Sequence, residues 1–260
     1  MSGAPHRALH AGRSRWTTIE RDLRRAGGLL IAGVDEVGRG SLAGPVVACA
    51  VVMPHDTRAI RGVDDSKLLG PAERSRLARL IIERALAYAL GAASAAEVDR
   101  FNIYRASVLA MLRALRRLPL AADHVLIDGR PIRQFPVPHR GIIDGDDKCY
   151  SIACASIVAK VTRDRLMTNL SRRYPTFAWE TNRGYATPSH VEGLLAAGPC
   201  VHHRRTFVVK ALAAPDAQVS LELGDEEQRG TRDGEERGTR NEDQRGTSNE
   251  EPVFPLAPNT

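Results

Sequence analysis

The stretch from residue 29 to residue 43 constrains this chain more than any other. An apolar run, Leu29–Ala32, leads within three residues to two adjacent acids, Asp35 and Glu36, and then to a glycine-flanked arginine in Gly38–Gly40. Apolar runs bounded by glycines are typical of strands and turns. The stretch therefore predicts a buried strand that ends in two carboxylates beside a loop with exposed backbone. Such an arrangement suits a metal ion held against a phosphate.

The rest of the body alternates strands and helices. Pro45–Met53 is a second apolar run, and it predicts a hairpin with Leu29–Asp35 across the glycine-rich turn. Ser94 and Glu97 fit a capping box, and Asn102 fits a helix N-cap. A mixed sheet covered by helices, an α/β fold, follows from this order of elements. Further strands are predicted at 86–92, 124–127 and 140–143, and helices at 71–84, 102–118, 150–172 and 188–197.

The charge of the chain is unevenly distributed. Segment 222–251 contains five arginines and eleven acids, a net charge of −6, so the remainder carries 32 Lys and Arg against 20 acids, a net charge of +12. A body this basic favours a polyanionic partner, most simply nucleic acid, and charge that serves solubility is the alternative.

The acidic tail has a repeat of its own. Arg-Gly-Thr recurs at 229, 237 and 245, and almost no large apolar residue lies between Leu223 and Val253. Such a segment cannot offset its ordering entropy by burial, so disorder is predicted. Its role is open between an inert tail and an acidic competitor for the basic body.

Composition also excludes several classes of protein. No apolar run approaches 18 residues, which argues against a membrane span, and the N-terminus lacks the apolar core of a secretory signal. The four cysteines form no zinc pattern, and Cys200 with His202 and His203 lacks a fourth ligand at suitable spacing. Reduced thiols in a cytoplasmic protein are expected.

Acids recur where predicted strands end or helices begin. Asp128 follows the strand 124–127, Asp146 precedes the long helix from Tyr150, and Asp64–Asp65 follow the hairpin. Each acid alone is better explained by a turn or a helix cap than by catalysis. Open α/β sheets place ligands beyond the carboxyl ends of their strands, so the acids together indicate a shared site in this basic protein.

Several longer motifs accompany these acids. They are GVDEVGRG at 33–40, DSK at 65–67, LIDG at 126–129, GD at 145–146, ASIVAKVTRD at 155–164, GY at 184–185 with His190, and HRRTF at 203–207. With these motifs in this order, the chain resembles ribonuclease HII over about residues 17–210. The resemblance implies an RNase H-like fold, a five-stranded mixed sheet flanked by helices, with a small C-terminal helical extension. It divides the chain into a flexible N-terminus (1–16), a catalytic domain (17–212) and a disordered acidic repeat tail (213–260).

The resemblance places the metal-binding, catalytic acids at Asp35, Glu36, Asp128 and Asp146. Asp164 competes with Asp146 because it also lies in a long motif. A helix from Tyr150 would carry Asp164 about 21 Å along its axis, whereas Asp146 would lie at the helix mouth. We therefore expect Asp164 to form ion pairs with Arg163 or nearby arginines. The alternative is a charged face that contacts DNA through Lys160 and Arg163.

Hydrolysis of a phosphodiester requires an activated water, in-line attack and a stabilised leaving oxygen. Two divalent ions about 3.5–4 Å apart meet these needs, and oxygen ligands select Mg²⁺ or Mn²⁺. We expect Asp35 to bridge the ions, with Glu36, Asp128 and Asp146 completing their shells. Neighbouring strand residues point to opposite faces, so Asp35 and Glu36 both reach the ions only if the strand ends or twists there.

Substrate choice depends on the 2′-hydroxyl group that separates RNA from DNA. Glycine has no Cβ, so Gly38, Arg39 and Gly40 can bring backbone groups close to a sugar. The resemblance implies that this loop and Tyr185 recognise the ribonucleotide at its junction with DNA. An aromatic plug in a glycine turn is the alternative for Tyr185. Lys67 is predicted to contact phosphate, with simple surface charge as its alternative.

The activity implied by the resemblance is that of an endoribonuclease. It would cut the RNA strand of RNA–DNA hybrids, and DNA on the 5′ side of single ribonucleotides, leaving 3′-hydroxyl and 5′-phosphate ends, as a monomer. Alternatives are a junction resolvase of the same fold and an inactive hybrid-binding protein, against which the intact set of acids argues. One departure is Asp144, where members of the family commonly carry lysine. This acid would either strengthen metal attraction or weaken phosphate binding.

Overall fold

A computed structural model of the chain describes residues 17–63 and 69–213. Its centre is one five-stranded sheet with the strand order β3-β2-β1-β4-β5. The first three strands are antiparallel neighbours, whereas β1, β4 and β5 run parallel. The strands are β1 (Ile31–Val37), β2 (Val46–Val52), β3 (Ala87–Ala93), β4 (His124–Asp128) and β5 (Arg140–Ile142).

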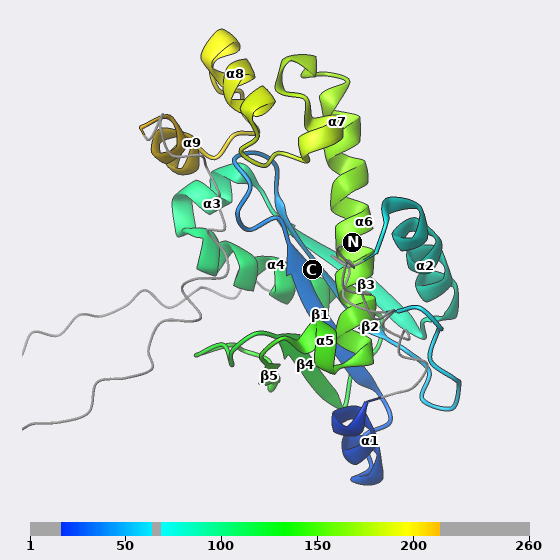
Figure 1. Ribbon diagram of the computed structural model, residues 1–260. Coiled ribbons are helices and arrows are strands. Elements are labelled where there is room, and N and C mark those ends of the chain that lie inside the picture. Colours follow the sequence, from blue (N-terminus) through cyan, green and yellow to red (C-terminus); the bar gives the residue numbers. More distant parts are fainter. Residues whose placement is uncertain (1–16, 64–68, 214–260) are drawn as a thin grey trace, which may run out of the picture.

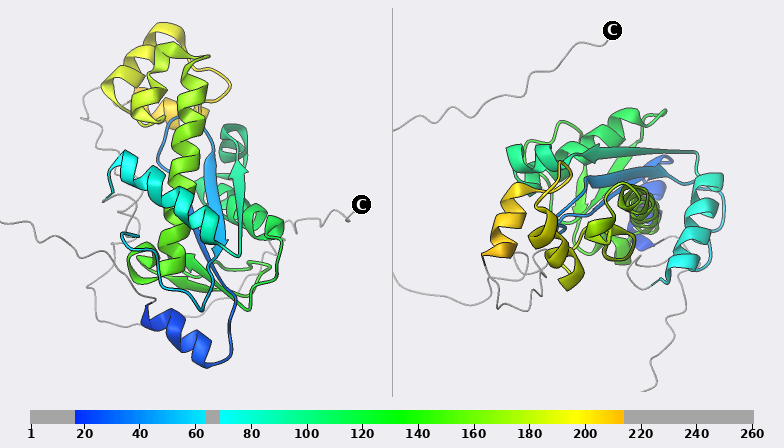
Figure 2. Two further views of the ribbon diagram at one scale, coloured as in Figure 1. Left: turned by 90° about the vertical axis from the view of Figure 1, so that its right-hand side faces the viewer. Right: turned by 90° about the horizontal axis from the view of Figure 1, so that it is seen from above.

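Helices cover both faces of the sheet (Figures 1 and 2). One face packs against α2 (Pro71–Arg84) and α6 (Tyr150–Ser171), and the other against α3 (Ala95–Phe101) and α4 (Ile103–Arg117). Strand β2, which lies between β3 and β1, is buried along its whole length because alternate residues enter the two cores. A strand covered on both sides reads as a continuous apolar run, as this one does.

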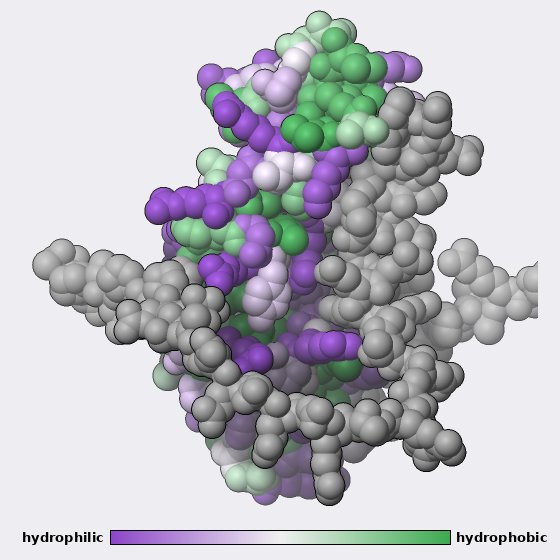
Figure 3. Space-filling view, turned by 90° about the vertical axis from the view of Figure 1, so that its left-hand side faces the viewer, coloured by the Kyte–Doolittle hydropathy of each residue, from purple (hydrophilic) through white to green (hydrophobic). Residues whose placement is uncertain are grey.

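Shorter helices lie at the two ends of α6 (Figure 1). Near its start are α1 (Thr18–Arg25) and α5 (Gly145–Lys148), and beyond its end the chain forms a 3₁₀ turn (Pro175–Phe177) and α7 (Trp179–Asn182). The C-terminal extension continues through α8 (Pro188–Ala197) and α9 (Arg205–Leu212). Apolar atoms gather at the height of α8 on the face in Figure 3, with hydrophilic side chains below them.

The long helix α6 is fixed against the sheet at its first turn. A Cβ at Gly33 would lie 2.1 Å from the backbone of Ser151, so glycine is needed for β1 to approach α6 this closely. The buried Glu20 of α1 accepts hydrogen bonds from the amides of Tyr150 (3.1 Å) and Ser151 (2.7 Å). A carboxylate at a helix N-terminus satisfies otherwise unpaired donors and complements the helix dipole.

The predicted fold class is confirmed, as is the hairpin of β1 and β2. The helices predicted at 71–84 and 188–197 have those bounds, and the Ser94–Glu97 capping box and the Asn102 cap are present. The predictions for residues 1–16, for Lys67 and for the tail from residue 214 lie outside the described residues. No helix among the described residues is both long and apolar enough to cross a membrane.

Candidate active site

Two of the predicted acids lie side by side at one end of the sheet. The parallel pairing of β1 with β4 ends with Val34 opposite Ile127, so Asp35 and Asp128 are the next residues on adjacent strands. Neighbouring strands are about 4.8 Å apart, which brings these two carboxylates into one site. The sequence-based expectation that strand ends would gather the acids is met for this pair.

Asp35 is the buried centre of the acidic cluster, with 6% of its surface exposed. Burial raises the pKa of Asp35 well above its ordinary value, and the charges of Asp128, Glu36 and Asp146 add to this rise. A hydrogen bond with Ser156 of α6 acts in the opposite direction. The other three predicted acids are thus all close enough to Asp35 to act on its charge.

Asp128 and Asp146 are linked through the backbone of α5. The amide of Gly145 donates to Asp128 Oδ1 at 2.6 Å, and a Cβ on Gly145 would lie 3.1 Å from that same oxygen. Asp146 is the next residue, inside the four-residue helix α5 that directly precedes α6, in agreement with its expected place at the mouth of the long helix. Its Oδ1 accepts the amide of Asp147 at 3.1 Å.

Glu36 occupies a different position from Asp35. The strand neither ends nor loses its β2 partner there, because pairing continues through Glu36–Ala48 and Val37–Val47. In a fully regular strand, alternation would direct Glu36 away from the face that carries Asp35. Its nearly buried side chain pairs with Arg39 at 2.9 Å. The pairing of β1 with β4 ends at Val34, so β1 has no β4 partner at Glu36. The charge of Glu36 still acts on Asp35 and raises its pKa.

The donor set suits a hard divalent cation. Carboxylates are the charged groups that act on Asp35, and carboxylate oxygens are the ligands that Mg²⁺ and Mn²⁺ prefer; the thiol of Cys49, opposite Asp35 on β2, is buried with a raised pKa. The repulsion between the carboxylates would be relieved by a bound cation. Within residues 17–63 and 69–213, however, no three His, Cys, Asp or Glu side chains are arranged as ligands of one ion.

Asp164 does not join the cluster, as the distance argument predicted, but its expected partner was wrong. Asp164 pairs with Lys160 one turn earlier on α6, at 3.0 Å, and the pair is partly buried. Arg163 is instead wholly buried and turned toward the loop between β1 and β2. It therefore cannot contribute to a DNA-contacting surface as the alternative interpretation required.

Gly38, Arg39 and Gly40 lie directly beyond β1, at the start of a loop whose later residues bind the turn that carries Tyr185. The amides of Leu42 and Ala43 both donate to the carbonyl of Gly184, at 2.8 and 3.2 Å. The Tyr185 ring contacts two cations of α6, with Lys160 Nζ 5.9 Å and Arg163 Cζ 5.7 Å from its centroid. The two predicted recognition elements are therefore joined to each other.

Two buried histidines, His190 and His203, lie next to each other, and His190 binds the backbone of Tyr185. His203 Nδ1 accepts the amide of Cys200 at 2.9 Å, so its proton is on Nε2, which lies 3.0 Å from His190 Nε2. His190 Nε2 also accepts from Trp179 Nε1 at 3.0 Å, and its Nδ1 donates to the Tyr185 carbonyl at 2.8 Å. Burial lowers the pKa of His203 to about 4, with the charge of His190 next in effect. Both imidazoles are neutral at pH 7.

The sequence did not predict that two arginines, Arg163 and Arg204, support the loop between β1 and β2. Both were visible within the quoted motifs 155–164 and 203–207, but nothing in those motifs shows that the side chains point inward. Both are completely buried. Their partners are mainly backbone carbonyls, which leave no pattern in the sequence.

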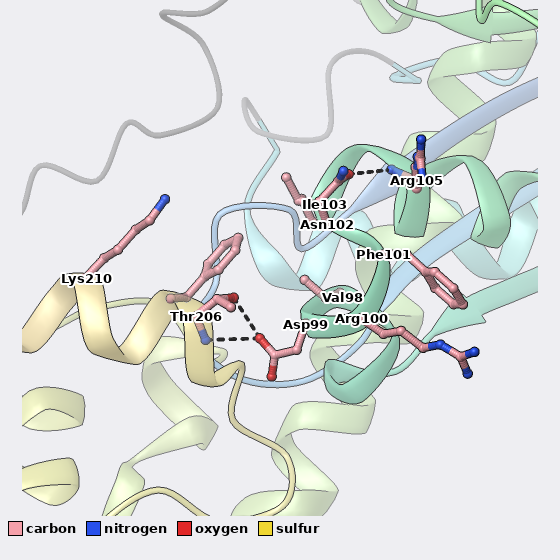
Figure 4. A pocket seen from close by; sticks show the side chains of 10 residues that line it. Val98, Asp99, Arg100, Phe101, Asn102, Ile103, Arg105, Thr206 and Lys210 are labelled. Atoms are coloured by element: carbon pink, nitrogen blue, oxygen red, sulfur yellow. Dashed lines mark hydrogen bonds between the residues drawn. The ribbon is translucent and has the colours of Figure 1, made fainter. Parts of the chain in front are cut away.

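A cavity of about 440 Å³ lies apart from the acids, between α3, α4 and α9 (Figure 4). Asp99 on its wall accepts hydrogen bonds from the amides of Arg205 (2.8 Å) and Thr206 (3.1 Å), and so caps α9. None of the four clustered acids lines this cavity. The carboxylate in its wall has a structural role.

Comparison with known proteins adds independent evidence. The sequence profile of the family described as Ribonuclease HII matches residues 32–210. A ribonuclease HII of Granulibacter bethesdensis is 49% identical over 209 residues, which are 78% of this chain and 95% of the relative. One from Thermosynechococcus vestitus is 50% identical over 190 residues, covering 73% and 88%. The crystal structure of ribonuclease H2 from Pyrococcus horikoshii matches with a TM-score of 0.60 at 25% identity, covering 70% of this chain and 96% of the other.

Proposed function

This chain belongs to the ribonuclease HII family of endonucleases, and we propose that it cuts both RNA–DNA hybrids and duplex DNA containing single ribonucleotides. Cleavage on the 5′ side of the ribonucleotide would leave 3′-hydroxyl and 5′-phosphate ends. The observation that carries the proposal is the acidic cluster, in which carboxylates from three separate segments surround the buried Asp35.

We assign the metal-binding role to Asp35, Glu36, Asp128 and Asp146. Two divalent ions, Mg²⁺ or Mn²⁺, would supply an activated water and stabilise the leaving oxygen. Neighbouring groups hold three of the acids by hydrogen bonds: Ser156 to Asp35, the Gly145 amide to Asp128, and Arg39 to Glu36. These bonds limit the movement of the three carboxylates before any ion binds.

Substrate recognition is assigned to Gly38, Arg39, Gly40 and Tyr185. They lie next to the cluster because β1 leads from Asp35 into the loop within three residues. The loop would read the 2′-hydroxyl, and the Tyr185 ring would pack against the adjoining deoxyribose. Lys67 is assigned a phosphate contact on the family resemblance alone, since it lies outside the described residues. We further propose that residues 17–212 form the catalytic domain and act as a monomer in the cytoplasm.

The test uses a duplex with one ribonucleotide, an all-RNA strand on DNA, and an all-DNA junction, each with Mg²⁺, Mn²⁺ or EDTA. We expect metal-dependent cleavage of the first two substrates, with the cut mapped to the 5′ side of the ribonucleotide. Asp128→Asn should abolish cleavage and retain hybrid binding. The matched control is Asp164→Asn, which removes an acid paired with Lys160 outside the cluster and should retain most activity.

Each competing function gives a different result. Cleavage of the junction with none at the lone ribonucleotide would identify a resolvase. Binding of hybrids without cleavage in either metal would identify an inactive binding protein. Full activity of Asp128→Asn in Mg²⁺ would contradict the assignment of the acids even if the substrate were correct.

A further inference from the structure

Two arginines without an acidic partner are buried behind the recognition loop. Arg163 comes from α6 and Arg204 from the residue before α9, and both side chains are fully shielded from solvent. Among the described residues neither forms an ion pair with a carboxylate. Burying an unpaired cation is costly, so its hydrogen bonds must compensate for lost hydration.

Arg204 uses its whole guanidinium group on the loop. Nη2 donates to the carbonyl of Gly38 and Nη1 to the carbonyl of Arg39, both at 2.5 Å. Nε and Nη2 also donate to the carbonyl of Gly44, at 3.2 and 3.0 Å. Charge-assisted bonds of this kind are stronger than those between neutral groups. The beginning and the end of the loop are therefore fixed to one side chain.

Arg163 connects the same loop to the Tyr185 turn. Its Nη2 donates to Ser41 Oγ (2.7 Å) and to the carbonyl of Ala43 (3.0 Å), while Nη1 donates to the carbonyl of Arg183 (2.9 Å). The Tyr185 ring lies against this guanidinium group, and a Cβ on Gly38 would lie 2.0 Å from its Nε. One buried side chain therefore sets the separation of the two recognition elements.

The inward direction of the carbonyls determines where the amides point. In a trans peptide the carbonyl and the N–H point in opposite directions, and the described part of the chain has no cis peptide. The carbonyls of Gly38 and Arg39 point at Arg204, so the amides of Arg39 and Gly40 point away from it. Neither amide donates to an acceptor within the described residues. Two adjacent donors are thus presented on the side opposite the arginines.

We infer that Arg204 is a positioning residue for ribonucleotide recognition, holding the Arg39 and Gly40 amides toward the substrate, and that Arg163 fixes the spacing between this loop and Tyr185. The inference rests on the proposed function and deepens it. The buried positive charge also polarises the peptide groups and strengthens the outward donors. The expected ligands of these amides are oxygen acceptors on the ribonucleotide.

The test measures discrimination rather than overall activity. In full-length Asp128→Asn protein, we compare Kd for a duplex with one ribonucleotide and Kd for the all-DNA duplex of the same sequence. Arg204→Lys keeps the charge, but an ammonium group lacks the fork that spans the carbonyls of Gly38, Arg39 and Gly44. The ratio of the two Kd values should fall about tenfold, the effect of one or two lost hydrogen bonds, while binding of all-DNA stays within about twofold.

Two further variants separate positioning from folding. Arg205→Lys changes the exposed neighbour of Arg204 and should leave the Kd ratio unchanged. Gly40→Ala adds a Cβ with no atom within 4 Å, so the melting temperature should hold while the ratio falls. An unchanged ratio in Arg204→Lys, or an equal loss in Arg205→Lys, would overturn the inference. Failure of the proposed function would instead appear as no cleavage at a ribonucleotide by the unsubstituted protein.

Discussion

Strand β1 joins two regions of opposite charge. At Asp35 it enters a cluster of carboxylates that repel one another, and from Gly38 it enters a loop held by two buried arginines. In the acidic cluster only Glu36 has a printed cationic partner, Arg39, and the neighbouring charges raise the pKa of Asp35, whereas each arginine faces several carbonyl dipoles. Repulsion at Asp35 would therefore be relieved by a bound cation, whereas the buried arginines are already compensated by the carbonyls they bind.

This difference predicts opposite effects on stability. Removing charge from the acidic cluster relieves repulsion and stabilises the protein at the expense of function. Removing an arginine leaves buried carbonyls without donors and destabilises it. The acidic cluster therefore lowers stability in return for function, whereas the buried arginines contribute to both stability and function.

The largest expected effect is that of Asp35→Asn. Activity should fall at least a hundredfold or so, because the central ligand loses its charge. In EDTA the free energy of unfolding should rise by about 1 kcal/mol, since Asn keeps an oxygen for the Glu36 amide and Ser156 while the repulsion disappears. Denaturant unfolding and single-turnover cleavage measure the two effects. A loss of stability in EDTA would show that the carboxylate is a structural group.

The next largest effect is on the arginine-supported region. Arg163→Gln should lower the free energy of unfolding by about 3 kcal/mol, because the carbonyls of Ala43, Pro45 and Arg183 lose their donor. Arg165→Gln, an exposed position two residues along α6, is the matched control and should change stability by less than about 0.5 kcal/mol. Equal stability of the two variants would refute the contrast between the regions.

Most of the fold was accessible from the sequence because its signals are local. Apolar runs marked the strands, Pro71 and Pro188 marked the starts of two helices, and the capping box at Ser94 was visible as a spacing. The acidic cluster was predictable for a related reason. Parallel strands deliver their last residues to one end of a sheet, which brings Asp35 and Asp128 together.

The arginine-supported region was not predictable because its contacts are long-range and carry no pattern. Arg204 binds carbonyls about 160 residues earlier in the chain, and every residue type offers a carbonyl. The buried Glu20 escaped notice for the same reason, since it caps α6 from about 130 residues away. Charged residues are usually exposed, so a sequence pattern assigns such groups to the surface unless the fold is known.

A smaller effect is expected on the pH dependence of stability, through the buried pair His190 and His203. The pKa of His203 is about 4 in the folded protein against an ordinary value of 6.5, so the unfolded chain binds more protons at mildly acid pH. Stability is therefore complete above about pH 7 and falls as the pH drops toward 4. Between pH 7.5 and 5.5 the loss should be about 1 kcal/mol larger in the parent than in His203→Asn.

The control for this pH dependence is His55→Asn, which removes an exposed histidine. It should lose as much stability between the two pH values as the parent does. The nearby groups that bear on His203 are His190 and His202, whose charges would both oppose its protonation. A parent whose stability is the same at both pH values would contradict the neutral, buried state of the pair.

The smallest effect concerns Asp144, which the sequence left open as a possible fifth acid of the site. Its side chain is 71% exposed and lies 3.4 Å from Lys148, and it is not among the charges that raise the pKa of Asp35. Its backbone is left-handed (φ 54°), a conformation that Asn tolerates well. Asp144→Asn should therefore change stability by less than about 0.5 kcal/mol and kcat/KM by less than about twofold.

The matched comparison is Asp146→Asn, two residues along the chain. Asp146 contributes to the field at Asp35, so its variant should need more Mg²⁺ for half-maximal cleavage, whereas Asp144→Asn should need the same amount as the parent. Titration of cleavage rate against Mg²⁺ measures both. An equal increase in the Mg²⁺ concentration for half-maximal cleavage in both variants would show that Asp144 also belongs to the acidic cluster.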